Sequence, residues 1–367
     1  MKPNGQSYSA GERLQLPDLA GTLRRIRDGG MEGFYRGVTA RYLAEAMRAN
    51  GGLVTENDLI SYQAKIRQPV IGSYHGYQIV SICPPSSGGT VLIEMLHALE
   101  GYDLHASGHN TPSTIHIMAE VMKRAYFDRA KYLGDPDFVN MPLSRLLSKG
   151  YVNQWRNTIG DMATPSSVLG AEILTGNESE ETTHFSVIDS EGNMVATTTT
   201  LEGGYGAKVI AKGTGFLLNN EMTDFAREVT ADGTRLANAV APNRRPRSSM
   251  SPTMIFDSNN QLLMITGSPG GNSIPAYVSK TIVGVFDWSL TAQQAVDLPN
   301  IIARGDSVRV EIANNKGKTI AANLARRGYN VIENMSENSR IHLIIVTPNG
   351  LDGAADKRRE GLVRSIK

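Results

Sequence analysis

The chain has 367 residues, of which 40% are hydrophobic and 20% are charged, so it is long enough to bury a sizeable core. Its formal net charge is +1, from 37 basic and 36 acidic side chains, which excludes the strong positive field of a typical nucleic-acid or membrane-surface protein. The single cysteine, Cys83, excludes an intrachain disulfide framework and a cysteine zinc cluster. We therefore expect a soluble globular protein.

Helical patterns dominate the first third of the chain. Apolar residues recur at helical spacing over residues 17–27, 34–50, 90–100 and 113–132, and Thr55 with Asp58 forms a capping-box pattern. Residues 77–82 have the pattern of a strand, which leads into a glycine-rich turn at 84–89. This turn lacks the lysine of a phosphate-binding loop, so we interpret it as a tight strand-to-helix connection. His105 and His109 fall in a loop-like segment, so we expect no metal and no other cofactor.

A polar segment then leads into a β-hairpin. Residues 157–181 are rich in Gly, Ser and Thr, a composition that predicts a flexible arm. Strand patterns at 185–189 and 194–201 flank a turn at 190–193. Further strand patterns occur at 253–256, 262–266, 308–312, 330–333 and 341–346, with helices at 274–287 and 319–327. Antiparallel strands with helices as outer layers indicate an α+β fold.

Thr182 and Thr183 stand at the start of this hairpin. A threonine that becomes the first residue of a chain carries a hydroxyl and an α-amine side by side. The amine has a reference pKa of about 7.7 to 8.0, so it can take up a proton near neutral pH. Such a threonine is a nucleophile that needs no histidine partner. From the hairpin alone, ordinary strand threonines remain the alternative.

The sequence from Thr182 to Val187, with Asp189, Gly192 and Thr198 downstream, resembles the processing-site signature of the γ-glutamyltransferase family. Segments 217–225, 242–253 and 267–271 continue the resemblance in order, and segments 50–53, 84–89 and 132–138 resemble the C-terminal half of that family's large subunit. The resemblance implies the four-layer αββα sandwich of N-terminal-nucleophile hydrolases, with two antiparallel sheets, incomplete at the N-terminus. It also implies cleavage of the bond between Glu181 and Thr182. Residues 1–181 and 182–367, from the large- and small-subunit regions, would then form one structural domain as a heterodimer.

The resemblance assigns roles to individual residues. Thr182 would be the nucleophile, Thr200 would hydrogen-bond it, and the N–H groups of Gly270 and Gly271 would stabilise the oxyanion. Glu202, Glu221 and Asp224 would bind the ammonium of a γ-glutamyl group through their carboxylates. Ser248 and Ser249 would donate hydrogen bonds to its α-carboxylate. Without the resemblance, these residues are interpreted as turn glycines, solvated charges and surface serines. The family's carboxylate-binding arginine lies in a portion with no counterpart here, and no arginine takes its place by motif.

The activity that the resemblance implies is a self-processing γ-glutamyl acyltransferase or hydrolase. It would cleave glutathione-like amides and pass the acyl group to water or to an amino acid or peptide. Glutaryl-β-lactam or poly-γ-glutamate amides are alternative substrates, and an unprocessed, inactive binding domain is the non-enzymatic alternative. A serine triad is disfavoured because no G-x-S-x-G elbow occurs. The chain shows no signal peptide, whereas the resemblance implies a periplasmic or secreted protein with its export signal upstream of Met1.

Overall fold

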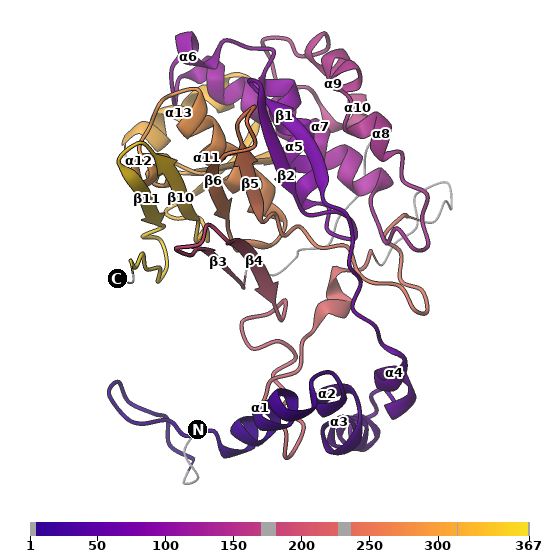
Figure 1. The fold of residues 1–367 in the computed structure, drawn as a ribbon. Coiled ribbons are helices and arrows are strands. Elements are labelled where there is room, and N and C mark those ends of the chain that lie inside the picture. Colours follow the sequence, from indigo (N-terminus) through magenta and orange to yellow (C-terminus); the bar gives the residue numbers. More distant parts are fainter. Residues whose placement is uncertain (1–4, 170–180, 227–235, 314, 366–367) are drawn as a thin grey trace. The chain divides into compact units, whose positions relative to one another are not determined.

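The computed structural model describes residues 5–169, 181–226, 236–313 and 315–365 (Figure 1). The chain divides into two compact units, one of Met1–Ile66 with Tyr205–Asn220, the other of Arg67–Gly204 with Glu221–Lys367. The predicted division at Glu181–Thr182 concerns a cleavage and stays a prediction. None of the helices in the described ranges is long and apolar enough to cross a membrane.

The first unit is built from short helices: α1 (Pro17–Gly29), α2 (Glu32–Tyr35), α3 (Gly37–Ala49) and α4 (Glu56–Ser61). Thr55 and Asp58 cap α4 reciprocally, so the predicted capping box is confirmed. The prediction of one continuous helix over 34–50 is wrong. Arg36 is extended and Gly37 has a φ of +63°, which separates α2 from α3. The Thr22 hydroxyl on α1 donates to the Thr214 carbonyl at 2.8 Å and so joins this unit's two segments.

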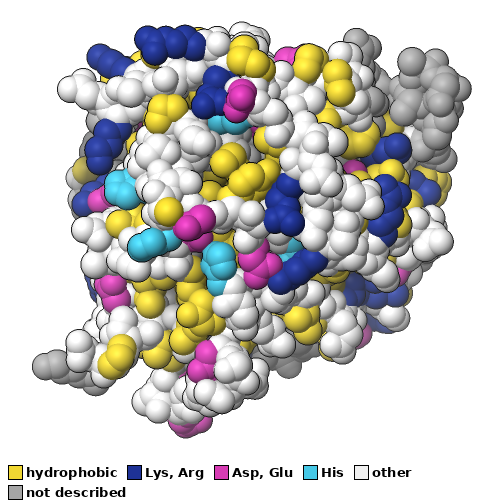
Figure 2. Space-filling view, turned by 90° about the horizontal axis from the view of Figure 1, so that it is seen from above, with side chains coloured by type: hydrophobic (Ala, Val, Ile, Leu, Met, Phe, Trp, Pro, Cys, Tyr) yellow, Lys and Arg dark blue, Asp and Glu magenta, His cyan; other side chains and the backbone are white. Residues whose placement is uncertain are grey.

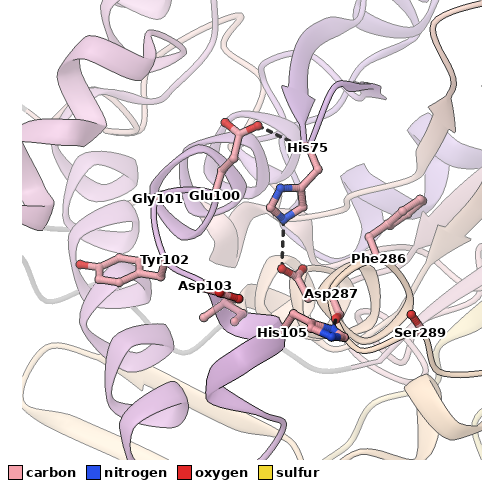
Figure 3. Close-up of a pocket in the computed structure, with 10 residues that line it drawn as sticks. His75, Glu100, Gly101, Tyr102, Asp103, His105, Phe286, Asp287 and Ser289 are labelled. Carbon is pink, nitrogen blue, oxygen red and sulfur yellow. Dashed lines mark hydrogen bonds and ion pairs between the residues drawn. The ribbon is translucent and has the colours of Figure 1, made fainter.

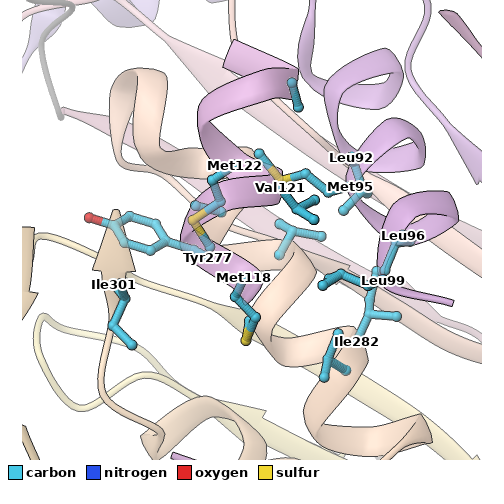
Figure 4. Packing of buried hydrophobic residues seen from close by; sticks show 14 of the residues in the cluster. Leu92, Met95, Leu96, Leu99, Met118, Val121, Met122, Tyr277, Ile282 and Ile301 are labelled. Carbon is cyan, nitrogen blue, oxygen red and sulfur yellow. The ribbon is translucent and has the colours of Figure 1, made fainter. Parts of the chain in front are cut away.

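The second unit contains a six-stranded antiparallel sheet whose order is β1-β2-β5-β6-β10-β11. Its strands are β1 (Val70–Tyr74), β2 (Tyr77–Ser81), β5 (Thr253–Phe256), β6 (Leu262–Gly267), β10 (His342–Thr347) and β11 (Gly350–Ala355). The helices α5 (Gly88–Leu99), α7 (Pro112–Tyr132) and α11 (Ile274–Phe286) share one buried hydrophobic cluster with this sheet. Figure 4 shows the centre of that cluster, which includes Leu92, Met95, Leu96, Leu99, Met118, Val121, Met122, Tyr277, Ile282 and Ile301.

A two-stranded hairpin, β3 (Thr182–Ile188) and β4 (Met194–Thr200), packs against β6 and β10 on the other face of the large sheet. Met264 on β6 belongs to the helix-side core, and Gly267, three residues later, therefore points to the opposite face. A Cβ at Gly267 would lie 2.2 Å from the ring of His184 on β3, so the hairpin packs closely there. The predicted α+β class, with helices and antiparallel sheets in layers, is confirmed.

A smaller sheet completes the second unit. It contains β7 (Ile301–Arg304), β8 (Ser307–Glu311) and β9 (Asn330–Asn334), of which β8 and β9 are parallel and joined through α13 (Asn315–Arg326). The remaining elements are α6 (Leu104–Ser107), α8 (Leu143–Leu146), α9 (Lys149–Arg156), α10 (Ser166–Leu169), α12 (Ala292–Asp297), η1 (Glu221–Asp224) and η2 (Gly271–Ser273). The predicted flexible arm, 157–181, contains α10, and its residues 170–180 lie outside the described ranges.

Two carboxyl groups are buried between α5 and α7. Glu94 is fully buried, and burial followed by the charge of Asp128 raises its pKa well above the ordinary value. Burial also raises the pKa of Asp128 from 3.8 to about 6, although the Tyr151 hydroxyl donates to it at 2.7 Å. A protonated Glu94 can share its proton with Asp128 at neutral pH.

This pair predicts a pH-dependent stability. Acids with raised pKa values bind more protons in the folded than in the unfolded chain, so their contribution to the free energy of unfolding falls as pH rises from about 4 through about 6. Glu94→Gln removes the titrating proton of Glu94. The difference in the free energy of unfolding between this variant and wild type should therefore favour the variant by about 1 to 3 kcal/mol more at pH 8 than at pH 5. Urea unfolding at both pH values measures this difference. The exposed Glu191→Gln is the control, and an equal difference in both variants would contradict the assignment.

Candidate active site

Thr182, the first residue of β3, lines a cavity of about 250 Å³. Glu181, Thr200, Arg340 and Arg359 line the same cavity. The chain is continuous from Glu181 into Thr182 in this structure, and Thr182 is only 8% exposed. The threonine hydroxyl therefore lies in a confined space that also holds the side chain of the preceding residue.

Turn chemistry fixes which residue lies opposite Thr182. The Asp189 carboxylate accepts the N–H groups of Glu191 and Asn193 at 2.9 and 2.8 Å, and so shapes the hairpin turn. The strands then pair without a register shift, and Thr182 lies opposite Thr200. Facing residues of antiparallel strands are within side-chain reach, so the hairpin turn determines the contact between the two threonines.

The Thr200 hydroxyl uses its hydrogen-bonding capacity in full. It accepts the hydroxyl proton of Thr182 at 3.2 Å and the N–H of Glu202 at 2.9 Å, and it donates to the Glu181 carbonyl at 3.0 Å. A hydroxyl has one proton and two acceptor positions, so these three bonds fix its orientation. Its proton is directed at the carbonyl of the Glu181–Thr182 peptide bond. The Thr182 proton points to Thr200, which leaves a Thr182 lone pair for another contact.

His184 is the histidine nearest to Thr182 in the sequence, and it is neutral. It is 1% exposed, and burial followed by the charge of His342 lowers its pKa to about 3. Its ring nitrogens hydrogen-bond the hydroxyls of Thr198 at 2.8 Å and Ser186 at 3.0 Å. Both ring nitrogens of His184 therefore contact hydroxyls of its own hairpin, at Thr198 and Ser186.

The glycine pair lies in a tight turn between β6 and α11. Gly270 has a φ of +132° and Gly271 a φ of +53°, both in the region that favours glycine. A Cβ at Gly270 would lie 2.4 Å from Cε2 of Tyr277, so the packing also demands glycine there. The Tyr126 hydroxyl donates to the Asn272 carbonyl at 2.6 Å and holds the turn from the core side. These contacts define the conformation of the turn and its need for glycine.

The acidic residues predicted to bind substrate lie on two different segments. Glu202 follows β4, is buried, has a φ of +72° and contacts Thr200 through its N–H. Glu221 and Asp224 lie at the two ends of η1, where the Asn238 amide donates to the Asp224 carbonyl at 2.7 Å. The structure therefore brings Glu202 to Thr200 and places Glu221 and Asp224 together on one helical turn.

A buried arginine holds the predicted serine pair. Arg129 on α7 is 1% exposed, and it donates to the hydroxyls of Ser87 at 2.8 Å and Ser249 at 2.7 Å. The Ser87 hydroxyl in turn donates to the Ser248 carbonyl at 2.7 Å. Ser249 is 3% exposed, so the alternative of a surface serine is wrong for this residue. Because its hydroxyl accepts from the guanidinium, its own proton points to a different acceptor.

Several residues that the sequence predicts for the site do not line the cavity at Thr182. Its lining, among the described residues, includes neither the glycine pair nor the serine pair nor the η1 carboxylates. Sequence reasoning missed three arginines, Arg129, Arg340 and Arg359. No motif marks them, and each reaches its partners through contacts between distant parts of the chain.

A second pocket, of about 460 Å³, lies beside the turn between β1 and β2 (Figure 3). Within it, His75 Nε2 lies 3.0 Å from the Asp287 carboxylate, and the backbone N–H of His75 donates to the Glu100 carboxylate at 2.8 Å. Figure 2, which looks onto the molecule from the side of α6, shows histidine and acidic side chains as neighbours on a surface of mixed charge. None of the predicted site residues lines this pocket.

Comparison with known proteins shows which proteins this chain is similar to. The sequence model described as gamma-glutamyltranspeptidase matches residues 1–366. A glutathione hydrolase proenzyme of Pseudomonas sp. (strain A14) is 42% identical over 303 residues, 80% of this chain and 52% of that protein. The corresponding proenzyme of Escherichia coli (strain K12) is 40% identical over 319 residues, 84% of this chain and 54% of that protein. The chain thus spans about half the length of these curated relatives.

Two acylases are similar over nearly the whole chain. The acylase ACY 1 proenzyme of Pseudomonas sp. (strain V22) is 36% identical over 360 residues, 98% of this chain and 62% of that protein. The crystal structure of a cephalosporin acylase from Bacillus halodurans superposes with a TM-score of 0.85 at 28% identity. That superposition covers 100% of this chain and 65% of the acylase. The shared fold therefore extends across both units of the chain.

Proposed function

Because this chain belongs to the γ-glutamyltranspeptidase family, we propose that it is a self-cleaving γ-glutamyl acyltransferase or hydrolase. The observation that carries the proposal is the hydrogen-bond chain from the Thr182 hydroxyl through Thr200 to the Glu181 carbonyl. The relatives at 40% and 42% identity are named as proenzymes, which supports a precursor that matures by cleavage. Glutathione-like γ-glutamyl amides are the proposed donors, and water or an amino acid or peptide is the proposed acceptor.

Self-cleavage begins at the Glu181–Thr182 bond. The Thr182 hydroxyl oxygen adds to the Glu181 carbonyl carbon, while Thr200 donates to the carbonyl oxygen as negative charge develops. The C–N bond breaks, the nitrogen takes the proton that the hydroxyl gives up and becomes the Thr182 α-amine, and an ester links Glu181 to the threonine oxygen. Water hydrolyses this ester and leaves a carboxylate on Glu181 and a free hydroxyl on Thr182.

Turnover reuses the same oxygen with the new amine as its base. The amine takes up the hydroxyl proton, the oxygen attacks the donor's amide carbon, and the proton passes to the leaving amine. Gly270 and Gly271 are the proposed donors to the oxyanion. Water or an acceptor amine then releases the acyl group from the threonyl ester.

Recognition of the glutamyl group is proposed to involve acidic side chains for its ammonium and neutral hydroxyls for its α-carboxylate. Glu202, Glu221 and Asp224 would meet the ammonium. Ser248 and Ser249 would donate to the α-carboxylate, a role supported by the Arg129 contact that directs the Ser249 proton away from the guanidinium.

Intact mass tests the proposal directly. The purified protein should resolve into one piece that ends at Glu181 and one that begins at Thr182, and the pair should release p-nitroaniline from γ-glutamyl-p-nitroanilide. The two products are expected to remain together as a heterodimer. A chain that stays whole for days at pH 7 to 8, where an α-amine titrates, would instead support an inactive binding domain.

Acylase activity is the second candidate, because two acylases are similar to nearly the whole chain in sequence or structure. It retains Thr182 and changes the acyl group to glutaryl or to poly-γ-glutamate. Parallel assays on γ-glutamyl-p-nitroanilide and glutaryl-p-nitroanilide separate the two. A higher kcat/KM for the glutaryl compound would favour the acylase.

Loss of the Thr200 hydroxyl should slow self-cleavage strongly. Thr200→Val keeps the size of the side chain and removes the donor to the Glu181 carbonyl, so we expect a rate about 100- to 1,000-fold lower. Thr200→Ser keeps the hydroxyl and should retain most of the rate. Cell-free synthesis followed by intact-mass analysis gives both rates. Equal rates for the valine variant and the wild type would contradict the assigned contact.

A further inference from the structure

The side chain of Glu181, the residue immediately before the bond proposed to be cut, contacts a residue near the end of the sequence. The guanidinium of Arg359 donates to the Glu181 carboxylate, and the two form an ion pair. Both side chains line the cavity that holds Thr182. The contact spans 178 residues of sequence, so it is a product of the tertiary fold.

Gly204 lies beside the Glu181 side chain. A Cβ added to Gly204 would lie 3.3 Å from Cγ of Glu181, so a larger residue there would crowd this side chain. Arg359 holds the carboxylate end of Glu181. Meanwhile the Thr200 hydroxyl holds its carbonyl oxygen at 3.0 Å. Both ends of the residue that supplies the acyl carbon are therefore fixed.

The charges in the cavity favour a carboxylate at this position. Arg340 lines the same cavity, and its Nη2 donates to the exposed carboxylate of Glu360 at 2.8 Å. Two arginines thus line the cavity, and one of them, Arg359, pairs with Glu181. An ion pair in which the carboxylate partner is 40% exposed contributes little to folding stability, so its main effect is on position.

We propose that Arg359 is a positioning residue for self-cleavage: it grips the Glu181 carboxylate and so fixes the scissile carbonyl in front of the Thr182 hydroxyl. This inference rests on the proposed function, because it assumes that the Glu181–Thr182 bond is cut. The contact of Arg359 is with the Glu181 carboxylate. It acts by limiting the rotation of Glu181, because a carbonyl displaced by about 1 Å from a productive geometry can lose about 100-fold in rate.

The test compares self-cleavage in seven versions of this chain made by cell-free synthesis: wild type, Arg359→Met, Glu181→Gln, the double variant of these two, Lys357→Met, Arg359→Lys and the reversed pair Glu181→Lys with Arg359→Glu. Intact mass follows the uncut fraction with time, and thermal unfolding checks that each chain is folded. Lys357 is the matched control, because it lies two residues away and its exposed side chain pairs with Asp297 at 3.2 Å.

Arg359→Met and Glu181→Gln should each cleave about 10- to 100-fold more slowly than wild type, with little change in Tm. Because both remove the same ion pair, the double variant should be no slower than the slower single variant. Lys357→Met should cleave at the wild-type rate. Arg359→Lys, which keeps the charge, and the reversed pair Glu181→Lys with Arg359→Glu should each recover part of the rate.

Three results would overturn the inference while leaving the proposed function intact. They are a wild-type rate for Arg359→Met, a double variant whose loss is the product of the two single losses, or a loss in Arg359→Met that matches a large fall in Tm. A wild-type chain that never cleaves would overturn the proposed function and, with it, the role of Arg359.

Discussion

Replacement of Thr182 by alanine is expected to abolish self-cleavage and turnover together, each by at least about 10⁴-fold. One oxygen performs both reactions in the proposed mechanism. The Thr182 hydroxyl donates to Thr200, whose own proton is directed at the Glu181 carbonyl. Intact mass reports the first reaction, and release of p-nitroaniline from γ-glutamyl-p-nitroanilide reports the second.

Thr183→Ala is the matched control for this experiment. Thr183 is the next residue of β3, and strand alternation turns its exposed side chain to the opposite face, although the residue also lines the cavity. The same atoms are removed in both variants, but only one variant loses the nucleophile. A Thr182→Ala chain that still divides at the Glu181–Thr182 bond would reject the threonine as the nucleophile, and Thr182→Ser should retain a measurable rate.

Gly270→Ala should have the second-largest effect, and it should act more on turnover than on self-cleavage. The added methyl would lie 2.4 Å from Tyr277 Cε2, on a backbone with a φ of +132°, so the turn must move. Loss of one oxyanion donor lowers kcat by about 100- to 1,000-fold. Self-cleavage should suffer less, because the Glu181 carbonyl already accepts from Thr200.

The methyl should also destabilise the fold, by about 1 to 3 kcal/mol for overpacking. Turnover is therefore measured on the folded, cleaved fraction after the unfolding midpoint has been determined. Gly150→Ala is the control, since a Cβ at Gly150 in α9 meets no atom within 4 Å. A Gly270→Ala enzyme with a wild-type kcat would remove Gly270 from the proposed oxyanion site.

The elements that the sequence predicts well depend on local signals. The capping box at Thr55 and the apolar helices near residues 90–100 and 274–287 appear close to their expected bounds, because caps and periodicity act within one segment. Strand β1 was missed. It contains Gly72, whose Cβ would lie 2.4 Å from Ile93 on α5, so a contact with a distant helix demands the glycine that makes the strand resemble a turn.

Strand β11 was missed for a similar reason. Its sequence, Gly-Leu-Asp-Gly-Ala-Ala, has low strand propensity, and pairing with β10 along its whole length stabilises it. The tertiary context therefore overrides local preference at this edge of the sheet.

Some contacts of the candidate site also follow from local sequence signals, and others depend on tertiary packing. The contact between Thr182 and Thr200 follows from hairpin register, which a turn sequence specifies. The contacts of Arg129 with Ser249 and of Arg359 with Glu181 join residues 120 and 178 positions apart. Neither arginine has a local pattern that distinguishes it from a solvated charge. Only the packing of α7 and of the C-terminal segment brings them to their partners.

The strand order of the large sheet has a consequence for the proposed cleavage. Strand β2 precedes the Glu181–Thr182 bond and β5 follows it, yet the two strands pair directly in the middle of one sheet. Before cleavage, unfolding of this sheet is unimolecular. After cleavage, the same loss of pairing is a dissociation, so the unfolding midpoint becomes dependent on protein concentration. Maturation would thus leave the ladder of hydrogen bonds intact and change the order of the unfolding reaction.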